Sequence, residues 1–175
     1  MSHKLQRKFI FFLIVALFIT AISFLYRNTS QGPADLNFKI VDGRQLRLEQ
    51  YRDRPVLINF WATSCTYCIY EMPELIKLYE ELSKEGLEII GVAMPYNSPD
   101  LVLKVIKDLG INFPIALDID GEAVKAFGGI PATPTHFLIS PQGKIAERIV
   151  GTVNPATLRS KIEAMLLEIK NSKKI

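Results

Sequence analysis

The stretch VLINFWATSCTYC, residues 56–68, decides the fold of this 175-residue chain. It opens with an apolar run, residues 56–61, that is typical of a buried strand and is interrupted only by Asn59. Cys65 and Cys68, the two cysteines of the sequence, follow where a segment with helical periodicity begins. A strand that delivers a Cys-x-x-Cys pair to the start of a helix is the geometry of a dithiol redox centre.

The pair is better explained by chemistry than by stability. An intramolecular disulfide can join only Cys65 to Cys68, because the chain has no other cysteine. A bridge that closes so short a loop removes little entropy from the unfolded chain, and a domain of this size buries enough core without it. At the first turn of a helix, unpaired amides and the helix dipole favour the Cys65 thiolate, which is the attacking species. Cys68, one turn later, would then resolve the mixed disulfide.

An apolar segment near the N-terminus predicts a membrane anchor. Residues 9–26 carry no charge and only two polar side chains, and a helix of that length is close to the hydrocarbon thickness of a bilayer. Three basic residues precede it, so the positive-inside rule places residues 1–8 in the cytoplasm. We expect a single-pass signal-anchor in the inner (cytoplasmic) membrane, with the catalytic domain on the periplasmic or extracytoplasmic side. A cleaved signal peptide is the alternative, although no small-x-small cleavage site follows the segment.

The net charge of +3 belongs to this N-terminal segment. Residues 1–27 hold four Lys and Arg and no acid, whereas residues 28–175 hold 17 basic and 18 acidic residues. A domain without a basic excess has no electrostatic footprint for nucleic acid. We therefore expect no nucleic-acid partner.

The rest of the chain alternates strand and helix signals and predicts an α/β domain over residues 36–170. A polar linker, residues 27–35, precedes it, and residues 171–175 form a C-terminal tail. Besides the strand at 56–61, we expect a hairpin across Asp42-Gly43, strands at 87–93, 113–117, 135–139 and 145–150, and helices at about 65–84, 99–109, 122–127 and 155–170.

The sequence resembles the TlpA/ResA-like, membrane-anchored thiol-disulfide oxidoreductases of the thioredoxin superfamily. The resemblance rests on the order strand, Trp-Ala-x-x-Cys-x-x-Cys, helix, and on the run Cys-x-x-Cys-x-x-Glu-x-Pro that continues to Glu71 and Pro73. The preceding hairpin and an insert between residues 95 and 130 add to it. It implies a thioredoxin-like fold, in which helices flank a central mixed sheet, with an N-terminal β-hairpin and a central insert, preceded by one transmembrane helix.

The resemblance assigns a docking strand beside the dithiol. Pro134 directly precedes the strand at 135–139 and matches the cis-proline that faces the dithiol in this family; Pro131 is the rival position. The backbone of Thr133 is implied to pair with an extended partner segment beside Cys65, a form of strand addition.

Four further residues are implied to border or tune the site. Thr66 and Tyr67, between the cysteines, and Trp61 are expected near bound substrate, Trp61 more by packing and shielding than by chemistry. The Thr66-Tyr67 dipeptide lacks the Gly-Pro of thioredoxin and the Pro-His of strong oxidants, so the sequence leaves the reduction potential open. Asn59 stands where cytoplasmic thioredoxins carry a buried aspartate, and an amide cannot accept a proton as a base would.

Proton handling therefore needs another residue, and Glu71 is the candidate. It lies one helical turn beyond Cys68 on the same face. A partly buried carboxylate there could take the proton from Cys68 during exchange. The alternative is an ordinary solvated acid on the helix surface.

The implied activity is that of a protein-disulfide reductase in cell redox homeostasis, acting by dithiol–disulfide exchange and needing no cofactor beyond the redox-active Cys65–Cys68 disulfide. Its implied partners are disulfide-containing extracytoplasmic proteins and a membrane thiol-disulfide electron donor. A disulfide oxidase or isomerase of the same fold stays open. Proteins dedicated to cytochrome c maturation usually carry Gly-Ala-Pro-Glu around the cis-proline, whereas Thr135 follows Pro134 here, which weakens a role confined to that substrate.

Two other functions fit less well. A copper-binding metallochaperone could use Cys65, Cys68 and His136 as soft ligands, but copper-delivery proteins of this fold have three residues between their cysteines. A structural zinc would need a fourth ligand, and the other histidine, His3, precedes the expected anchor. A peroxidase would carry its cysteine in the context Pro-x-x-x-Thr/Ser-x-x-Cys, which is absent.

Overall fold

The structure, a computed structural model, describes residues 36–172 and three isolated positions nearer the N-terminus, Leu13, Phe18 and Thr20. The chain divides into two units, Met1–Gly32 and Pro33–Ile175, and the fold below is that of the second. The expected n-region, membrane anchor and linker lie outside the described residues, apart from those three positions. In the part that is described, no helix is both long and apolar enough to cross a membrane.

Within residues 36–172, five strands form a mixed sheet in the order β5-β4-β3-β6-β7. The strands are β3 (Val56–Trp61), β4 (Glu88–Ala93), β5 (Ile115–Leu117), β6 (Thr135–Ile139) and β7 (Ile145–Val150). β3, β4 and β5 are parallel, β6 is antiparallel to β3, and β7 is antiparallel to β6. Every residue of β3, β4 and β6 is buried, because both faces of the sheet are covered.

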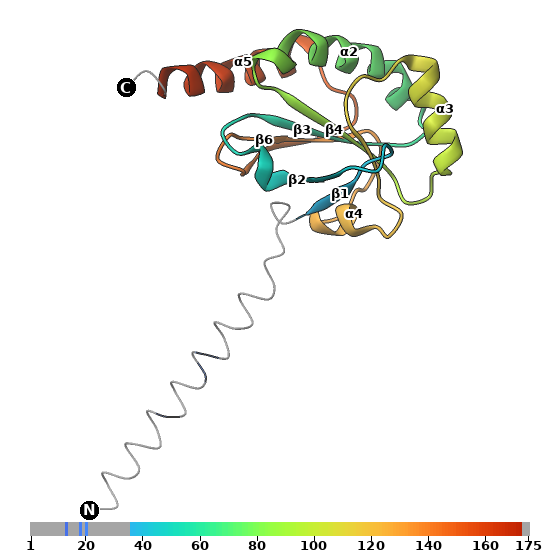
Figure 1. The fold of residues 1–175 in the computed structure, drawn as a ribbon, viewed down its shortest axis with the longest axis horizontal. Helices are drawn as coiled ribbons and strands as arrows, with labels where there is room; N and C mark the ends of the chain where they lie inside the picture. Colours follow the sequence, from blue (N-terminus) through green and yellow to red (C-terminus); the bar gives the residue numbers. More distant parts are fainter. Residues whose placement is uncertain (1–12, 14–17, 19, 21–35, 173–175) are drawn as a thin grey trace, which may run out of the picture. The chain divides into compact units, whose positions relative to one another are not determined.

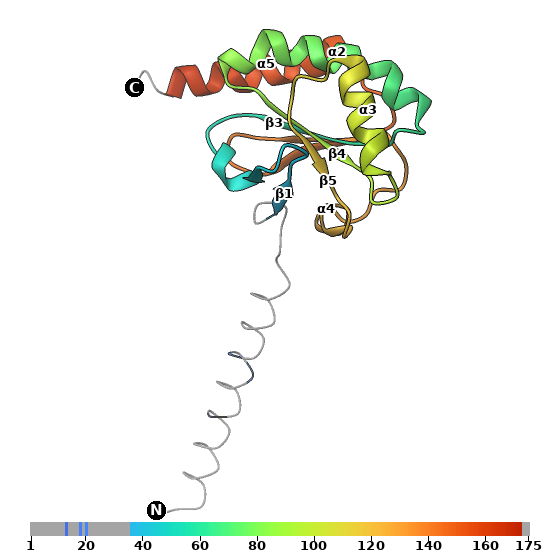
Figure 2. The ribbon, with the colours of Figure 1, turned by 45° about the vertical axis from the view of Figure 1, so that its right-hand side comes forward.

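Three helices cover one face of this sheet (Figures 1 and 2). They are α2 (Thr66–Leu82), α3 (Pro99–Leu109) and α5 (Pro155–Ser172). Leu57 and Trp61 of β3 point into this layer. The next turn after α2 is the 3-10 segment η3 (Ser83–Glu85).

The opposite face is covered by smaller elements. These are the antiparallel hairpin of β1 (Asn37–Lys39) and β2 (Gln45–Arg47), the 3-10 turn η2 (Leu48–Tyr51) and α4 (Glu122–Ala126). The intervening β3 residues, Ile58 and Phe60, point into this second layer, as the alternation of side chains along a strand requires.

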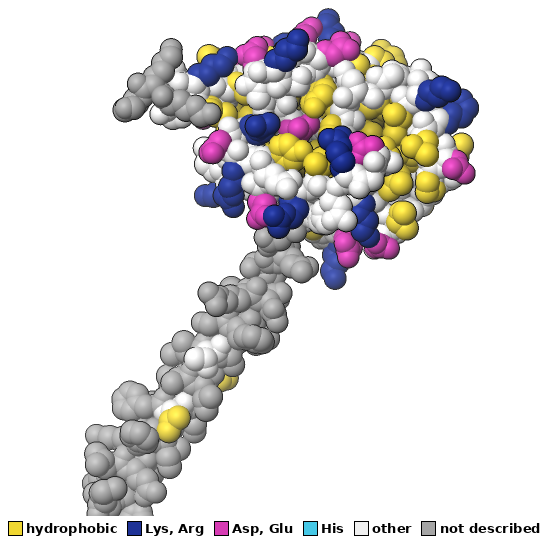
Figure 3. Space-filling model, viewed as in Figure 1, with side chains coloured by type: hydrophobic (Ala, Val, Ile, Leu, Met, Phe, Trp, Pro, Cys, Tyr) yellow, Lys and Arg dark blue, Asp and Glu magenta, His cyan; other side chains and the backbone are white. Residues whose placement is uncertain are grey.

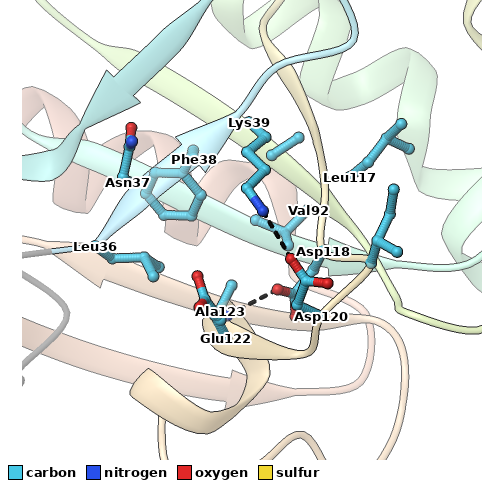
Figure 4. A pocket seen from close by; sticks show the side chains of 12 residues that line it. Leu36, Asn37, Phe38, Lys39, Val92, Leu117, Asp118, Asp120, Glu122 and Ala123 are labelled. Carbon is cyan, nitrogen blue, oxygen red and sulfur yellow. Dashed lines mark hydrogen bonds and ion pairs between the residues drawn. The ribbon is translucent and has the colours of Figure 1, made fainter.

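The hairpin is fixed to the central insert at the β5–α4 connection (Figure 4). Lys39 of β1 pairs with Asp120 at 2.7 Å, and Ile40 forms a bridge to Ala116 of β5. Asp118 accepts hydrogen bonds from the amides of Ala123 and Val124, at 2.8 and 2.9 Å, and so caps the first turn of α4. The cavity left between these elements holds only about 20 Å³. The hairpin, the β5–α4 connection and α4 therefore pack together as one layer.

Helix ends fall where the capping signals in the sequence put them. α3 begins with Pro99 and ends at Gly110, whose φ of 65° is left-handed. Asn154 Oδ1 accepts a hydrogen bond from the amide of Thr157 at 3.0 Å and caps α5, as expected. After α2 and η3, Gly86 ends the helical segment with a φ of 119°.

The predicted elements are confirmed, with differences only at their ends. β3, β6 and β7 have the predicted bounds. β5 begins two residues later than expected, after Pro114, which has no amide hydrogen for the sheet. The thioredoxin-like arrangement of a mixed sheet between helices, with hairpin and insert, is thus present in residues 36–172.

Glu88, at the start of β4, is a carboxylate with little access to water. Its Oε1 accepts hydrogen bonds from the Tyr79 hydroxyl at 3.0 Å and the Ile89 amide at 3.2 Å. Burial nevertheless raises the pKa of Glu88 above its usual value, and burial together with this carboxylate raises the pKa of Tyr79 to about 12. The folded state therefore binds the Glu88 proton more tightly than the unfolded chain does, so this group costs stability as pH rises from about 4 through the raised pKa.

We expect Glu88→Gln to raise the unfolding temperature by a few degrees at neutral pH, because it removes a buried charge and keeps an acceptor for Tyr79. The difference should vanish in acid, where Glu88 is protonated in both states. Thermal unfolding across pH measures it. Glu168→Gln, at an exposed position of α5, is the matched control and should show no such trend. A less stable Glu88→Gln at neutral pH would mean that the accepted hydrogen bonds outweigh the cost of burial.

Candidate active site

Cys65 and Cys68 form a disulfide at the start of α2. Cys65 is the N-cap residue: its backbone is extended, and its Sγ accepts a hydrogen bond from the amide of Cys68 at 3.1 Å. Unpaired amides and the helix dipole stabilise negative charge at this position. When the disulfide opens, Cys65 is therefore the sulfur placed to carry the thiolate, as the sequence predicts.

The two sulfurs differ in access. Cys65 is partly exposed, whereas Cys68 is fully buried in the layer between the sheet and α2. An incoming disulfide can reach Cys65 and not Cys68. This asymmetry agrees with the predicted roles, attack by Cys65 and resolution by Cys68.

The loop before β6 lies against the attacking sulfur. The Thr133–Pro134 peptide bond is cis, and the carbonyl oxygen of Thr133 lies 3.4 Å from Cys65 Sγ. Pro134 is buried, and its carbonyl accepts a hydrogen bond from the amide of Gly151 at 2.8 Å. The expected cis-proline at position 134 is confirmed, and its rival Pro131 is an exposed loop residue.

Behind the disulfide lies a group of four buried polar side chains, Asn59, Trp61, Glu71 and His136. Within the described residues, they hold all the buried side-chain nitrogen and oxygen atoms that lack a hydrogen-bond partner. Leaving such a group unpaired costs about 1–3 kcal/mol, and proteins concentrate such exceptions where they serve a function. The cluster therefore belongs to the site.

Glu71 and His136 approach each other within this cluster. His136 Nε2 lies 3.0 Å from Glu71 Oε1, which is the distance of an ion pair, at angles outside those of a hydrogen bond. Asn59 lies directly opposite His136 in the β3–β6 ladder. The sequence assigned Glu71 a place beside Cys68, and the structure buries it, so the alternative of a solvated surface acid is wrong.

The contact of Glu71 with His136 was missed in the sequence, where His136 was considered only as a metal ligand. The signal was available, because a histidine in the otherwise apolar run 135–139 has to be buried with a partner. In the described residues, no group of three or more His, Cys, Asp or Glu is arranged to hold a metal ion. The geometry thus gives the copper-binding alternative no support.

The residues expected around bound substrate separate into two groups. Thr66 and Tyr67 are exposed next to Cys65, with Tyr67 70% accessible, and their role as substrate contacts stays a prediction. Trp61 is 0% exposed, so its assignment as a substrate-binding residue needs correction: it packs beneath the site. Gly91 leaves the room for this, since a Cβ there would come within 3.3 Å of Trp61 Nε1 and 2.5 Å of Ile115 Cδ1.

The surface of the domain carries mixed charge. Lys and Arg alternate with Asp and Glu over the face shown in Figure 3, and no area of a single sign stands out on it. This agrees with the near-zero net charge of residues 28–175 and gives no support to nucleic-acid binding.

Comparison with known proteins places the chain in a family. Residues 31–148 match the model of the AhpC/TSA family. The chain belongs to the AhpC/TSA family. Ala62 stands three residues before Cys65, where the peroxidatic motif has Thr or Ser, so membership brings the fold without that motif.

Two relatives share one name. The thiol-disulfide oxidoreductase ResA of Geobacillus thermodenitrificans is 33% identical over 173 residues, 93% of this chain and 98% of its own length. ResA of Bacillus thuringiensis subsp. konkukian is 37% identical over 118 residues, so this match spans 66%, slightly less than two thirds, of that relative. A thiol:disulfide interchange protein of the thioredoxin family from Chlorobium tepidum superposes with a TM-score of 0.70 at 26% identity, covering 77% of this chain and 96% of that one. The resemblance stated from the sequence is confirmed for the family and the fold.

A further residue that the sequence did not single out holds the segment before Cys65. Asn97 Oδ1 accepts hydrogen bonds from both the amide and the hydroxyl of Thr63, at 2.8 and 2.9 Å. Its Nδ2 donates to the carbonyl of Met94 at 2.8 Å. One side chain thus ties the loop that carries Cys65 to the end of β4.

We expect Asn97→Ala to destabilise the protein by about 1–3 kcal/mol, since it leaves the Thr63 amide without its acceptor. It should also slow attack by Cys65 several-fold, because the loop no longer holds the sulfur beside Thr133. Denaturant unfolding and single-turnover thiol release measure the two effects. Asn97→Asp keeps the acceptor for Thr63 and should retain most of the rate. Full activity in Asn97→Ala would contradict the positioning role.

Proposed function

We propose that this protein is a thiol-disulfide oxidoreductase that reduces disulfides of extracytoplasmic proteins through Cys65 and Cys68. The observation that carries the proposal is the disulfide at the N-terminus of α2, with one sulfur accessible and the other buried. The name shared by the similar proteins, thiol-disulfide oxidoreductase, supports the same chemistry.

The reaction proceeds by two exchanges. The Cys65 thiolate attacks one sulfur of the substrate disulfide, the Cys65–substrate bond forms, and the other substrate sulfur leaves as a thiolate that takes a proton from water. Cys68 then loses its proton and attacks Cys65 Sγ, which releases the second substrate thiolate. The substrate gains two electrons, and the enzyme is left with the Cys65–Cys68 disulfide. No cofactor takes part.

The substrate segment docks along the loop before β6. The Thr133 carbonyl, 3.4 Å from Cys65 Sγ, lies where an extended chain carrying the attacked sulfur has to pass. Thr66 and Tyr67 border the same sulfur from the α2 side. Main-chain pairing at Thr133 would accept many sequences, which suits a reductant of several proteins.

The protein works from the membrane in this proposal. Residues 9–26 anchor it in the inner membrane, with its N-terminus in the cytoplasm and residues 36–170 on the periplasmic or extracytoplasmic side. The uncharged apolar run and the basic residues before it support this arrangement. In an oxidising compartment the Cys65–Cys68 disulfide has to be reduced again after each reaction, so a membrane thiol-disulfide protein supplies the electrons.

The dipeptide Thr66-Tyr67 controls the reduction potential and with it the direction of electron transfer, reduction or oxidation of the substrate. We expect the reduction potential to be about −200 mV or lower, in the range of reducing dithiol proteins. Equilibration of the protein with dithiol buffers of known potential measures it, with Cys65→Ser as the control that shows no transition. A value near about −120 mV, the range of strong oxidants, would make the protein an oxidase or isomerase of the same fold.

We expect Cys68→Ser to accumulate mixed disulfides with partner proteins through Cys65, because the resolving thiol is gone. Non-reducing electrophoresis of cells that produce the variant detects them, and the complexes should stay in the membrane fraction after an alkaline wash. Cys65→Ser is the matched control and should trap little, since Cys68 is buried. Equal trapping through Cys68 alone would reverse the assigned roles, and complexes freed by the wash would contradict the anchor.

A further inference from the structure

A histidine that the exchange reaction does not require lies buried behind the dithiol. His136 is 0% exposed in the middle of β6, and its Nε2 is 3.0 Å from Glu71 Oε1. Neither its Nδ1 nor its Nε2 has a hydrogen-bond partner. A fully buried imidazole with one carboxylate contact is costly for a purely structural residue.

The topology brings this histidine to the side of the sheet where the dithiol lies. Its strand neighbour Phe137 packs in the layer with α4, whereas Leu138 packs in the layer with α2. Side chains alternate along a strand, so His136 faces α2. Glu71 follows Cys68 by one turn on the same face of α2, and its carboxylate meets the imidazole at 3.0 Å.

A buried carboxylate beside Cys68 needs this partner in order to act as a base. Alone, it would either carry an uncompensated charge that opposes a thiolate next to it or take a proton from water and cease to be an acceptor. A pair that holds one proton is neutral as a whole, whether as carboxylate and imidazolium or as acid and imidazole. Taking the proton of Cys68 then gives a thiolate beside a cationic pair, which leaves the site neutral as a whole.

Glu71 borders a cavity of about 190 Å³ between α2 and the start of α5, and we take this cavity as the pair's route to water. Glu74, Lys77 and Arg159 are the charged groups that line it. From β3 the facing group is the neutral amide of Asn59.

The charged side chains of β7, the other neighbour of β6, are engaged elsewhere. Glu147 pairs with Lys161 at 2.6 Å, and Arg148 donates to the carbonyl of Gly129 at 2.7 Å. Glu71 is therefore the carboxylate that His136 meets at ion-pair distance.

We propose that His136 is a positioning residue for the resolving step: it holds Glu71 in a pair that accepts the proton of Cys68. This inference rests on the proposed function. The Cys68 proton passes to the pair, the Cys68 thiolate attacks Cys65 Sγ, the bond from Cys65 to the substrate sulfur breaks, and the pair returns its extra proton to water through the cavity.

The test follows the two half-reactions separately in the reduced full-length protein. An aromatic disulfide whose thiol product is coloured releases one thiol when Cys65 attacks and a second when Cys68 resolves. His136→Gln should slow the second release at least about tenfold and flatten its pH profile, and leave the first release unchanged. Glu71→Gln should slow the same phase, and the double variant should be no slower than the slower single one.

Phe137→Leu is the matched control, because it disturbs the same strand on its opposite face and should leave both phases intact. If His136→Gln does not fold, His136→Asn takes its place in the measurement of the second release.

Three results would overturn the inference: an unchanged second phase in both His136 variants, equal slowing of both phases, or effects of Glu71→Gln and His136→Gln that multiply independently. Those results leave the proposed function standing. If the wild-type protein released no thiol at all, the proposed function would fall, and the role of His136 with it.

Discussion

The central strand β3 is covered on both faces, and the rest of the site is arranged around its C-terminal end. All six of its residues are buried, so the chain can place reactive groups only where the strand leaves the core, as in other open α/β sheets. α2 starts there with Cys65 as its cap. β6 runs antiparallel on the neighbouring side, with Thr135 opposite Phe60, and this register delivers Thr133 and Pro134 to the same edge. Burial of β3 on both faces thus brings Cys65 and the Thr133–Pro134 loop together at its C-terminal end.

Three polar residues are buried in this core at positions that packing alone does not explain. Asn59, Glu71 and His136 occupy positions that apolar side chains would fill at lower cost. Asn59 provides no proton acceptor where a buried acid stands in cytoplasmic thioredoxins, and in our proposal the Glu71 carboxylate and the His136 imidazole take that role. The fold places the Glu71 carboxylate 3.0 Å from the His136 imidazole, and this pairing offsets part of the cost of burying either group alone.

Much of this could be predicted from the sequence. β3 and β6 are short apolar runs with clear ends, and Ser98-Pro99, Gly110 and Asn154 mark helix limits by capping chemistry that operates locally. The contact between Glu71 and His136 could not be predicted, because it joins residues far apart in the chain and depends on the β3–β6 register. Trp61 is expected near bound substrate, more by packing and shielding than by chemistry, but a sequence does not reveal how far the end of a strand is closed. Gly91 on the neighbouring strand leaves room for the indole, and Trp61 is fully buried.

Burial of Cys68 has a consequence for oxidative damage. A small oxidant in the surrounding compartment can reach only Cys65, and a sulfenic acid formed there has the Cys68 thiol beside it, with the two Cα atoms 5.2 Å apart. Condensation of the two loses water and gives back the disulfide, a form that electrons can restore, before a second oxidant converts the sulfur irreversibly to sulfinic acid. Oxidants would thus consume the reducing power delivered to this protein and leave the protein itself repairable.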